Sequence, residues 1–182
     1  MQALKGLSDR SIKPGEVIVL CSRGPMGSGM EEVAQITLAL KHLPWGKNVA
    51  LLTDARFSGV STGACVGHIG PEALAGGPIG KLDENDLIRI EIDRETLEGT
   101  LDFVGTEENR VNPDEGARIL GQRQGHQGLR PDPRMPADSR LWAALQNIGG
   151  GTWGGCVYEV DEIIRRLNSA ETPPENKIET GK

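Results

Sequence analysis

Two short apolar runs with a helical period between them constrain the fold more than any other feature of this chain. Residues 16–21 (EVIVLC) and 48–53 (NVALLT) have the length and composition of buried strands. Between them, apolar residues recur at three- and four-residue steps over 30–43, which predicts a helix with Ser28 as its N-cap and Pro44 at its end. A strand–helix–strand order favours parallel pairing through a right-handed crossover.

The rest of the chain alternates short predicted strands with irregular stretches. Residues 62–69 fit either a short helix or a strand, 87–92 (LIRIEI) alternate apolar and charged side chains, and 97–104 have the composition of a strand. Residues 105–140 carry many Gly, Pro, Arg and Asp without a period, so we expect an irregular arm, which could wrap a partner subunit. The length of the chain fits a single domain over 1–168.

Two helices and a tail are predicted at the C-terminal end. Apolar spacing indicates helices over 139–147 and 161–167. Residues 169–182 contain two prolines and many charges, which predicts a disordered tail.

Composition excludes several function classes. The net charge is −6 with scattered Lys and Arg, and aromatic residues make up only 3%, so a nucleic-acid groove is not expected. No apolar stretch approaches the roughly 18 residues that span a bilayer, and the N-terminus has no secretory signal. Cys21, Cys65 and Cys156 stand too far apart for a disulfide framework or a zinc motif. We therefore expect a cytoplasmic protein with reduced thiols and neither a membrane nor a nucleic-acid partner.

Three glycine-rich loops with polar tips, 22–29, 54–59 and 67–78, suggest a catalytic surface. The first could cradle a small anion, since helix N-termini attract anions, although it matches neither the Walker loop nor the dinucleotide fingerprint. Glu31 or Glu32 beside it suits a hard cation such as Mg²⁺, but solvated first-turn carboxylates are more common at such positions.

The polar residues of the other two loops also have structural interpretations. Asp54 and Arg56 could form an ion pair, and Ser58 could be a turn residue. His68 is more often a structural hydrogen-bonding residue than a base, and Glu72 is expected to cap or begin a short helix. No G-x-S-x-G elbow is present. The residues alone predict a small-anion site built from three loops.

Taken together, the loops resemble the C-terminal domain of the dihydroxy-acid dehydratase and phosphogluconate dehydratase family. The matching blocks are GPMGSGMEE (24–32), LTDARFSG (52–59) and GHIGPEA running into GGPI (67–79), and the resemblance covers roughly residues 12–105. A narrower similarity, to the xylonate-type (pentonate) sugar-acid dehydratases, rests on LPWGK (43–47), FSGVSTGAC (57–65), PDPR (131–134) and GGTWGGC (150–156).

The resemblance implies a hydro-lyase that dehydrates a 2,3-dihydroxy sugar acid to a 2-keto-3-deoxy acid. It implies a swivelling β/β/α domain, a barrel-like β-structure with flanking helices, within the mixed α/β class. It implies Ser58 as the base that takes the C2 proton and Glu32 as a magnesium ligand. Supporting, substrate-binding roles follow for Arg56, Thr62 and His68. In the complete enzyme an iron–sulfur cluster acts as Lewis acid on the C3 hydroxyl, and Mg²⁺ binds the carboxylate end of the substrate.

The resemblance stops short of the cofactor-binding part of the family. The cluster cysteines and the other magnesium ligands lie in an N-terminal domain that nothing in this sequence resembles, and the three cysteines here fall outside the cluster positions. We therefore expect an N-terminal iron–sulfur domain as partner, on the same or a separate polypeptide, and no dehydratase activity from this chain alone.

On these grounds the chain is expected to be an excised domain, a truncated product or half of a split enzyme, and at least a homodimer. The alternative is a non-catalytic stand-alone or relic domain that binds a partner subunit or a small acid.

Overall fold

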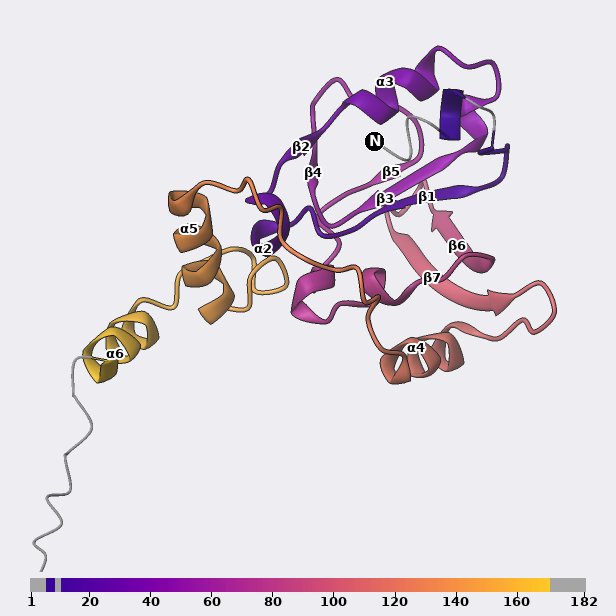
Figure 1. The fold of residues 1–182 in the computed structure, drawn as a ribbon. Coiled ribbons are helices and arrows are strands. Elements are labelled where there is room, and N and C mark those ends of the chain that lie inside the picture. Colours follow the sequence, from indigo (N-terminus) through magenta and orange to yellow (C-terminus); the bar gives the residue numbers. More distant parts are fainter. Residues whose placement is uncertain (1–5, 9–10, 171–182) are drawn as a thin grey trace, which may run out of the picture.

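The structure is a computed structural model that describes residues 6–8 and 11–170 (Figure 1). Its helices, 3-10 helices and strands follow in chain order. They are β1 (Val17–Leu20), α2 (Pro25–Ser28), β2 (Glu32–Val33), α3 (Gln35–Lys41), η1 (Gly46–Asn48), β3 (Ala50–Thr53), β4 (Arg56–Phe57), β5 (Cys65–Val66), η2 (Ala73–Ala75), η3 (Pro78–Lys81), β6 (Asp86–Ile92), β7 (Gly99–Thr106), α4 (Pro113–Gln122), α5 (Ala137–Ile148) and α6 (Val160–Ala170).

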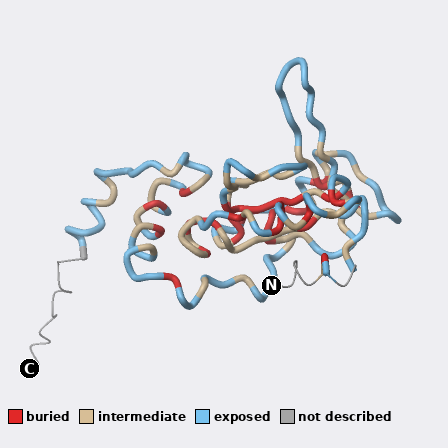
Figure 2. The backbone as a smooth tube through the Cα atoms, turned by 90° about the horizontal axis from the view of Figure 1, so that it is seen from above, coloured by how far each residue is buried: buried red, intermediate tan, exposed pale blue. Residues whose placement is uncertain are grey.

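A three-stranded parallel sheet in the order β1-β3-β5 forms the centre of the molecule. Leu51 and Leu52 on β3 are each only 1% exposed, and α3 contributes Ile36 and Leu40 to the apolar cluster that contains Leu51. Figure 2 shows the buried residues gathered in this central region. The predicted parallel pairing of the two apolar runs is confirmed, and the strand alternative for 62–69 is the one observed.

The predicted helix over 30–43 is wrong in its first half. α2 ends at Ser28, Met30 has a left-handed φ of 62°, and β2 then pairs in parallel with β4 before α3 begins at Gln35. Ser28 is therefore not the N-cap of this helix, and its Oγ donates a hydrogen bond to the Arg23 carbonyl at 2.9 Å. Backbone pairing with a strand more than twenty residues away overrides the local helical pattern.

β6 and β7 form an antiparallel hairpin, and α4 packs against β7. The prediction of an irregular arm over 105–140 is wrong where regular elements occupy it: β7 reaches Thr106, α4 spans Pro113–Gln122 and α5 begins at Ala137. Asn112 is the N-cap of α4, and its side chain accepts from Glu115 N. Gly116 allows α4 to approach the backbone of Phe103 closely. Arg123, at the end of α4, lies over the Phe103 ring at 4.7 Å.

The last two helices extend away from the sheet (Figure 1). α5 packs against α2, and α6 follows as an exposed helix in contact with α5. Both predicted C-terminal helices are present, and the predicted tail lies outside the described residues beyond Ala170.

The mixed α/β class is confirmed, with small parallel and antiparallel sheets. The strands of the described residues do not close into a barrel. Within the same residues, no helix has both the length and the apolar character needed to cross a membrane.

Candidate functional site

The buried carboxyl group of Asp54 ties two of the glycine-rich loops to the end of β3. Its side chain is fully buried. Oδ1 accepts the Arg23 N–H at 2.9 Å, and Oδ2 accepts the N–H groups of Ser22 at 3.1 Å and Ala73 at 3.0 Å. The prediction of an ion pair with Arg56 is wrong: within the part of the chain that the structure describes, both oxygens of Asp54 accept hydrogen bonds from backbone N–H groups instead.

Glu72 occupies the place where an external anion was expected. It is 3% exposed, and its two oxygens accept the Met26 N–H at 2.9 and 3.2 Å. This N–H belongs to the first turn of α2, so the predicted cradle is filled by the protein's own side chain. Glu72 stands at the N-cap position of η2, but its side chain makes no capping hydrogen bond there. Burial raises the pKa of Glu72, and the Met26 N–H bond opposes this while the nearby Asp54 adds to it.

The pairing of β2 with β4 sets Glu32 opposite Arg56. Arg56 Nη1 lies 3.9 Å from Glu32 Oε2, and Arg56 Nε donates to the Met30 carbonyl at 3.0 Å. Glu31 faces a different arginine, since its Oε1 lies 3.0 Å from Arg23 Nη1. The side chains of the two consecutive glutamates are therefore held by separate cations. Glu32 faces Arg56 with its carboxylate, whereas Glu31 accepts the Arg56 N–H with its backbone carbonyl at 3.4 Å.

Ser58 follows β4 directly and is partly buried. Its Oγ accepts the Val60 N–H at 3.4 Å, and its carbonyl accepts the Ser61 N–H at 3.0 Å, so the turn interpretation is confirmed. No side chain of the described residues hydrogen-bonds to Ser58 Oγ. As far as the structure describes the chain, the hydroxyl has no built-in general base.

Thr62 and His68 flank this edge on exposed turns. Thr62 lines a cavity of about 420 Å³ between α3 and β5. His68 has a left-handed φ of 54°, and its backbone N–H donates to the Ala55 carbonyl at 2.8 Å. Its ring makes no hydrogen bond within the described ranges, so the structure assigns it neither a structural nor a basic role. Glu32, Arg56 and Ser58 thus share the β2–β4 edge, with the other two residues beside it.

The residues of this chain do not fit a complete site for Mg²⁺ or for an iron–sulfur cluster. Residues 6–8 and 11–170 contain no group of three or more His, Cys, Asp or Glu side chains that could hold a metal ion. Glu32 supplies one carboxylate, and the guanidinium of Arg56 partly balances the negative charge of that carboxylate. Cys21, Cys65 and Cys156 are free thiols, and burial together with Asp54 raises the pKa of Cys21.

Sequence reasoning missed the scaffolding roles of Asp54 and Glu72. The bonds of Asp54 to the first loop span 31 and 32 positions and that of Glu72 spans 46, so no local pattern reports them. One available signal was an acidic residue directly after a buried strand, a position where carboxylates often meet the N–H groups of neighbouring loops.

Known proteins match this chain along most of its length. The family described as dihydroxy-acid/6-phosphogluconate dehydratase C-terminal matches residues 1–127. D-xylonate dehydratase YagF of Escherichia coli (strain K12) is 55% identical over 170 residues, 93% of this chain and 26% of that protein. D-xylonate dehydratase YjhG of the same organism is 55% identical over 163 residues, 88% of this chain and 25% of that protein.

A more distant relative lies outside the xylonate enzymes. Dihydroxy-acid dehydratase 2 of Bordetella bronchiseptica is 46% identical over 166 residues, which cover 87% of this chain and 27% of that protein. The chain thus spans about a quarter of the length of the curated relatives it matches. Together with the loops described above, these matches show that the chain belongs to the dihydroxy-acid/6-phosphogluconate dehydratase C-terminal family.

Proposed function

We propose that this chain is the C-terminal part of a hydro-lyase that dehydrates a 2,3-dihydroxy sugar acid, of the xylonate type, to a 2-keto-3-deoxy acid. Membership of a dehydratase family supports the reaction class. Two relatives named as D-xylonate dehydratases, each 55% identical to this chain, support the sugar-acid substrate.

The observation that carries the proposal is the β2–β4 edge. There Glu32 on β2 lies opposite Arg56 on β4, so a carboxylate faces a guanidinium. The hydroxyl of Ser58 follows β4 directly. Asp54 immobilises the adjoining loops through three backbone N–H groups. A fixed set of polar groups on a rigid frame is what orientation of a small acid requires.

In the proposed reaction, Ser58 Oγ takes the proton from C2 of the sugar acid. An ordinary serine hydroxyl is far too weak a base, so its pKa must be depressed at the moment of transfer. Among the described residues, only the Val60 N–H hydrogen-bonds to this oxygen, over a long 3.4 Å. The missing activation must therefore come from outside this chain's described residues, while Arg56, Thr62 and His68 bind and orient the substrate.

We further propose that an N-terminal iron–sulfur domain completes the site, on the same or a separate polypeptide. It would supply the cluster and the remaining ligands of a Mg²⁺ ion that Glu32 contacts. The swivelling β/β/α arrangement is retained as part of this proposal, as are a homo-oligomer of at least two copies and a cytoplasmic location. The three free thiols suit a reducing compartment.

Substitution of Ser58 tests the proposal in an enzyme reconstituted from this chain and an iron–sulfur domain. Ser58→Ala should lower kcat for xylonate dehydration by about 10²–10⁴-fold, the usual contribution of a proton-transferring group. The measurement is formation of the 2-keto-3-deoxy acid. Ser61→Ala is the matched control in the same loop, and its rate should stay near wild type. Near-wild-type turnover by Ser58→Ala would remove this serine as the base, and no turnover by any reconstituted form would favour the non-catalytic alternative.

A further inference from the structure

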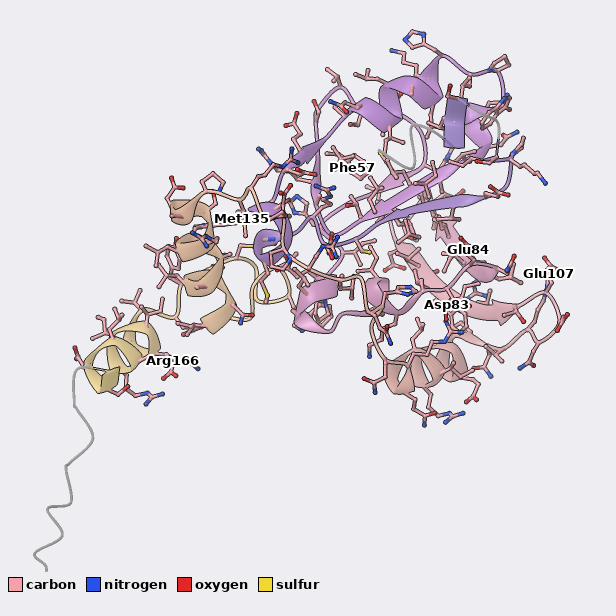
Figure 3. The ribbon with its side chains drawn as sticks, viewed as in Figure 1. Phe57, Asp83, Glu84, Glu107, Met135 and Arg166 are labelled. Carbon is pink, nitrogen blue, oxygen red and sulfur yellow. The ribbon has the colours of Figure 1, made fainter. Side chains whose placement is uncertain are left out.

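A second polar cavity lies beside the first glycine-rich loop and is not lined by Glu32, Arg56 or Ser58. Its volume is about 510 Å³, within the range of small-molecule sites. One wall is formed by the residues directly after β1. The other is the segment that runs from α4 past α2 to α5, near the buried Met135 (Figures 1 and 3). Its polar lining residues are Ser22, Arg23, Arg130, Asp132 and Arg134.

The charge in this cavity is positive, although the chain carries a net charge of −6. Three guanidinium groups meet one carboxylate. Asp132 accepts from Arg134 Nη2 at 3.2 Å and lies 4.0 Å from Arg23 Nη1. The Arg130 side chain makes no ion pair or hydrogen bond with any described residue, so all its donors are available. Such a local surplus attracts and retains anions.

Both walls of the cavity are fixed by backbone hydrogen bonds. On one side, Asp54 accepts the N–H groups of Ser22 and Arg23 at 3.1 and 2.9 Å. On the other, the Asp132 N–H donates to the Gly27 carbonyl at 2.7 Å. The arginines therefore project from a frame that is ordered before any ligand arrives, which lowers the entropic cost of binding.

Ser22, one of the residues that line the cavity, is unusual in two respects. Its φ is 61°, a left-handed conformation that costs a residue other than glycine free energy and that clusters at functional sites. Its Oγ is buried and has no hydrogen-bond partner among the described residues. A buried hydroxyl without a partner is uncommon, and a bound water would satisfy it.

We infer that this cavity binds a small oxyanion, namely the phosphate or carboxylate group of a small acid. Guanidinium groups donate paired N–H bonds that match the oxygens of both. A ligand on Arg23 competes with Glu31, which lies 3.0 Å from that guanidinium and directly precedes Glu32. The inference does not rest on the dehydration chemistry, since binding is measured on this chain without turnover.

The test is an NMR titration of the 182-residue chain with inorganic phosphate and, separately, with xylonate at constant ionic strength. Saturable shifts of the amides of Ser22, Arg23, Arg130 and Arg134 are expected with at least one of the two anions. Saturation by phosphate alone assigns a phosphate ligand, and saturation by xylonate alone assigns a carboxylate. Shifts that follow chloride equally, that never saturate or that lie elsewhere would overturn the inference.

Charge variants sharpen the result. Arg130→Gln should weaken binding roughly three- to fivefold, the scale of an exposed ion pair, and Glu31→Gln should strengthen it because a competitor for Arg23 is removed. Arg118→Gln on α4 is the matched control, as it removes the same charge from outside the cavity. Equal weakening by Arg118→Gln and Arg130→Gln would mean general charge attraction and would also overturn the inference.

Discussion

At the scale of single residues, the side chain of Asp54 accepts three backbone N–H groups from two loops and is shielded from solvent. Asp54→Asn would turn an amide NH₂ toward one or more of these N–H groups and leave buried donors unpaired. We expect a loss of roughly 1–3 kcal/mol in the free energy of unfolding. Urea denaturation measures this loss. Asp114→Asn, at an exposed position, is the control and should stay within about 0.5 kcal/mol of wild type. Equal stability of the two variants would contradict the scaffolding role of Asp54.

Glu72 makes a prediction about pH, because burial raises its pKa above the ordinary value of 4.5. Between the unfolded and the raised folded pKa, the folded protein holds a proton that the unfolded chain releases. Stability from this group therefore rises as the pH falls through that window. Glu72→Gln lacks the effect, so the stability of wild type relative to the variant should increase as the pH is lowered toward 4.5 in denaturant titrations. Parallel pH curves would contradict it.

The identities of several site residues could be predicted from the sequence, but their connections could not. The block around Arg56 and Ser58 was recognisable because its motif is local and specific. The bonds of Asp54 and Glu72 join residues far apart in the chain, and they depend on how the strand ends converge. A carboxylate in a sequence looks the same whether it binds solvent, an arginine or three backbone N–H groups.

At the scale of elements, α4 and β7 meet at Gly116, where an added Cβ would collide with the Phe103 carbonyl. Gly116→Ala should therefore cost about 1–3 kcal/mol, since the backbone of a strand cannot move aside easily. Gly121→Ala in the same helix meets nothing within 4 Å and should instead stabilise by about 0.5–1 kcal/mol. Thermal unfolding of both variants checks the contrast, and two changes of the same sign would refute the packing described for α4.

The elements themselves were predictable where the local sequence agrees with the fold. The runs that became β1 and β3 are short and apolar, and both were identified. α4 was missed because its two glycines interrupt the helical signal, and its stability comes partly from a cap by Asn112 and from packing on β7. The helix expected from Met30 was wrong because β2 gains a partner in β4, a contact that no local window contains.

At the scale of the whole molecule, α6 carries an apolar stripe that no described residue covers. Val160, Ile164 and Leu167 are exposed at helical spacing. Asp161 and Glu162 lie in the first turn of the helix, and Glu162 forms ion pairs with Arg165 and Arg166 one turn further along. Hydrogen bonds from Arg165 and Arg166 lower the pKa of Glu162 to about 2, so it stays charged. The stripe offers an apolar surface for the homo-oligomer proposed above.

Replacement of the stripe tests this self-association. The double variant Ile164→Asp, Leu167→Asp should shift the chain toward a monomer in sedimentation equilibrium, because charges would enter an apolar contact. Leu97→Asp is the control, since Leu97 is 86% exposed on the β6–β7 hairpin and far from α6. A wild-type chain that stays monomeric at all concentrations, or a double variant that associates equally well, would rule out this contact.

Asp54 and Glu72 hold the loops through main-chain N–H groups. The shape of the loops therefore does not depend on which side chains the loops carry. Every residue except proline offers a backbone N–H, so substitutions at Ser22, Arg23, Met26 or Ala73 can keep the anchors while changing what the loops present to a ligand. Such a frame permits the ligand specificity of the loops to change without rebuilding the fold, in keeping with function residing in sites carried by a common scaffold. The two buried carboxyls would then be the part of this surface least free to vary, because the loops depend on their bonds to backbone N–H groups.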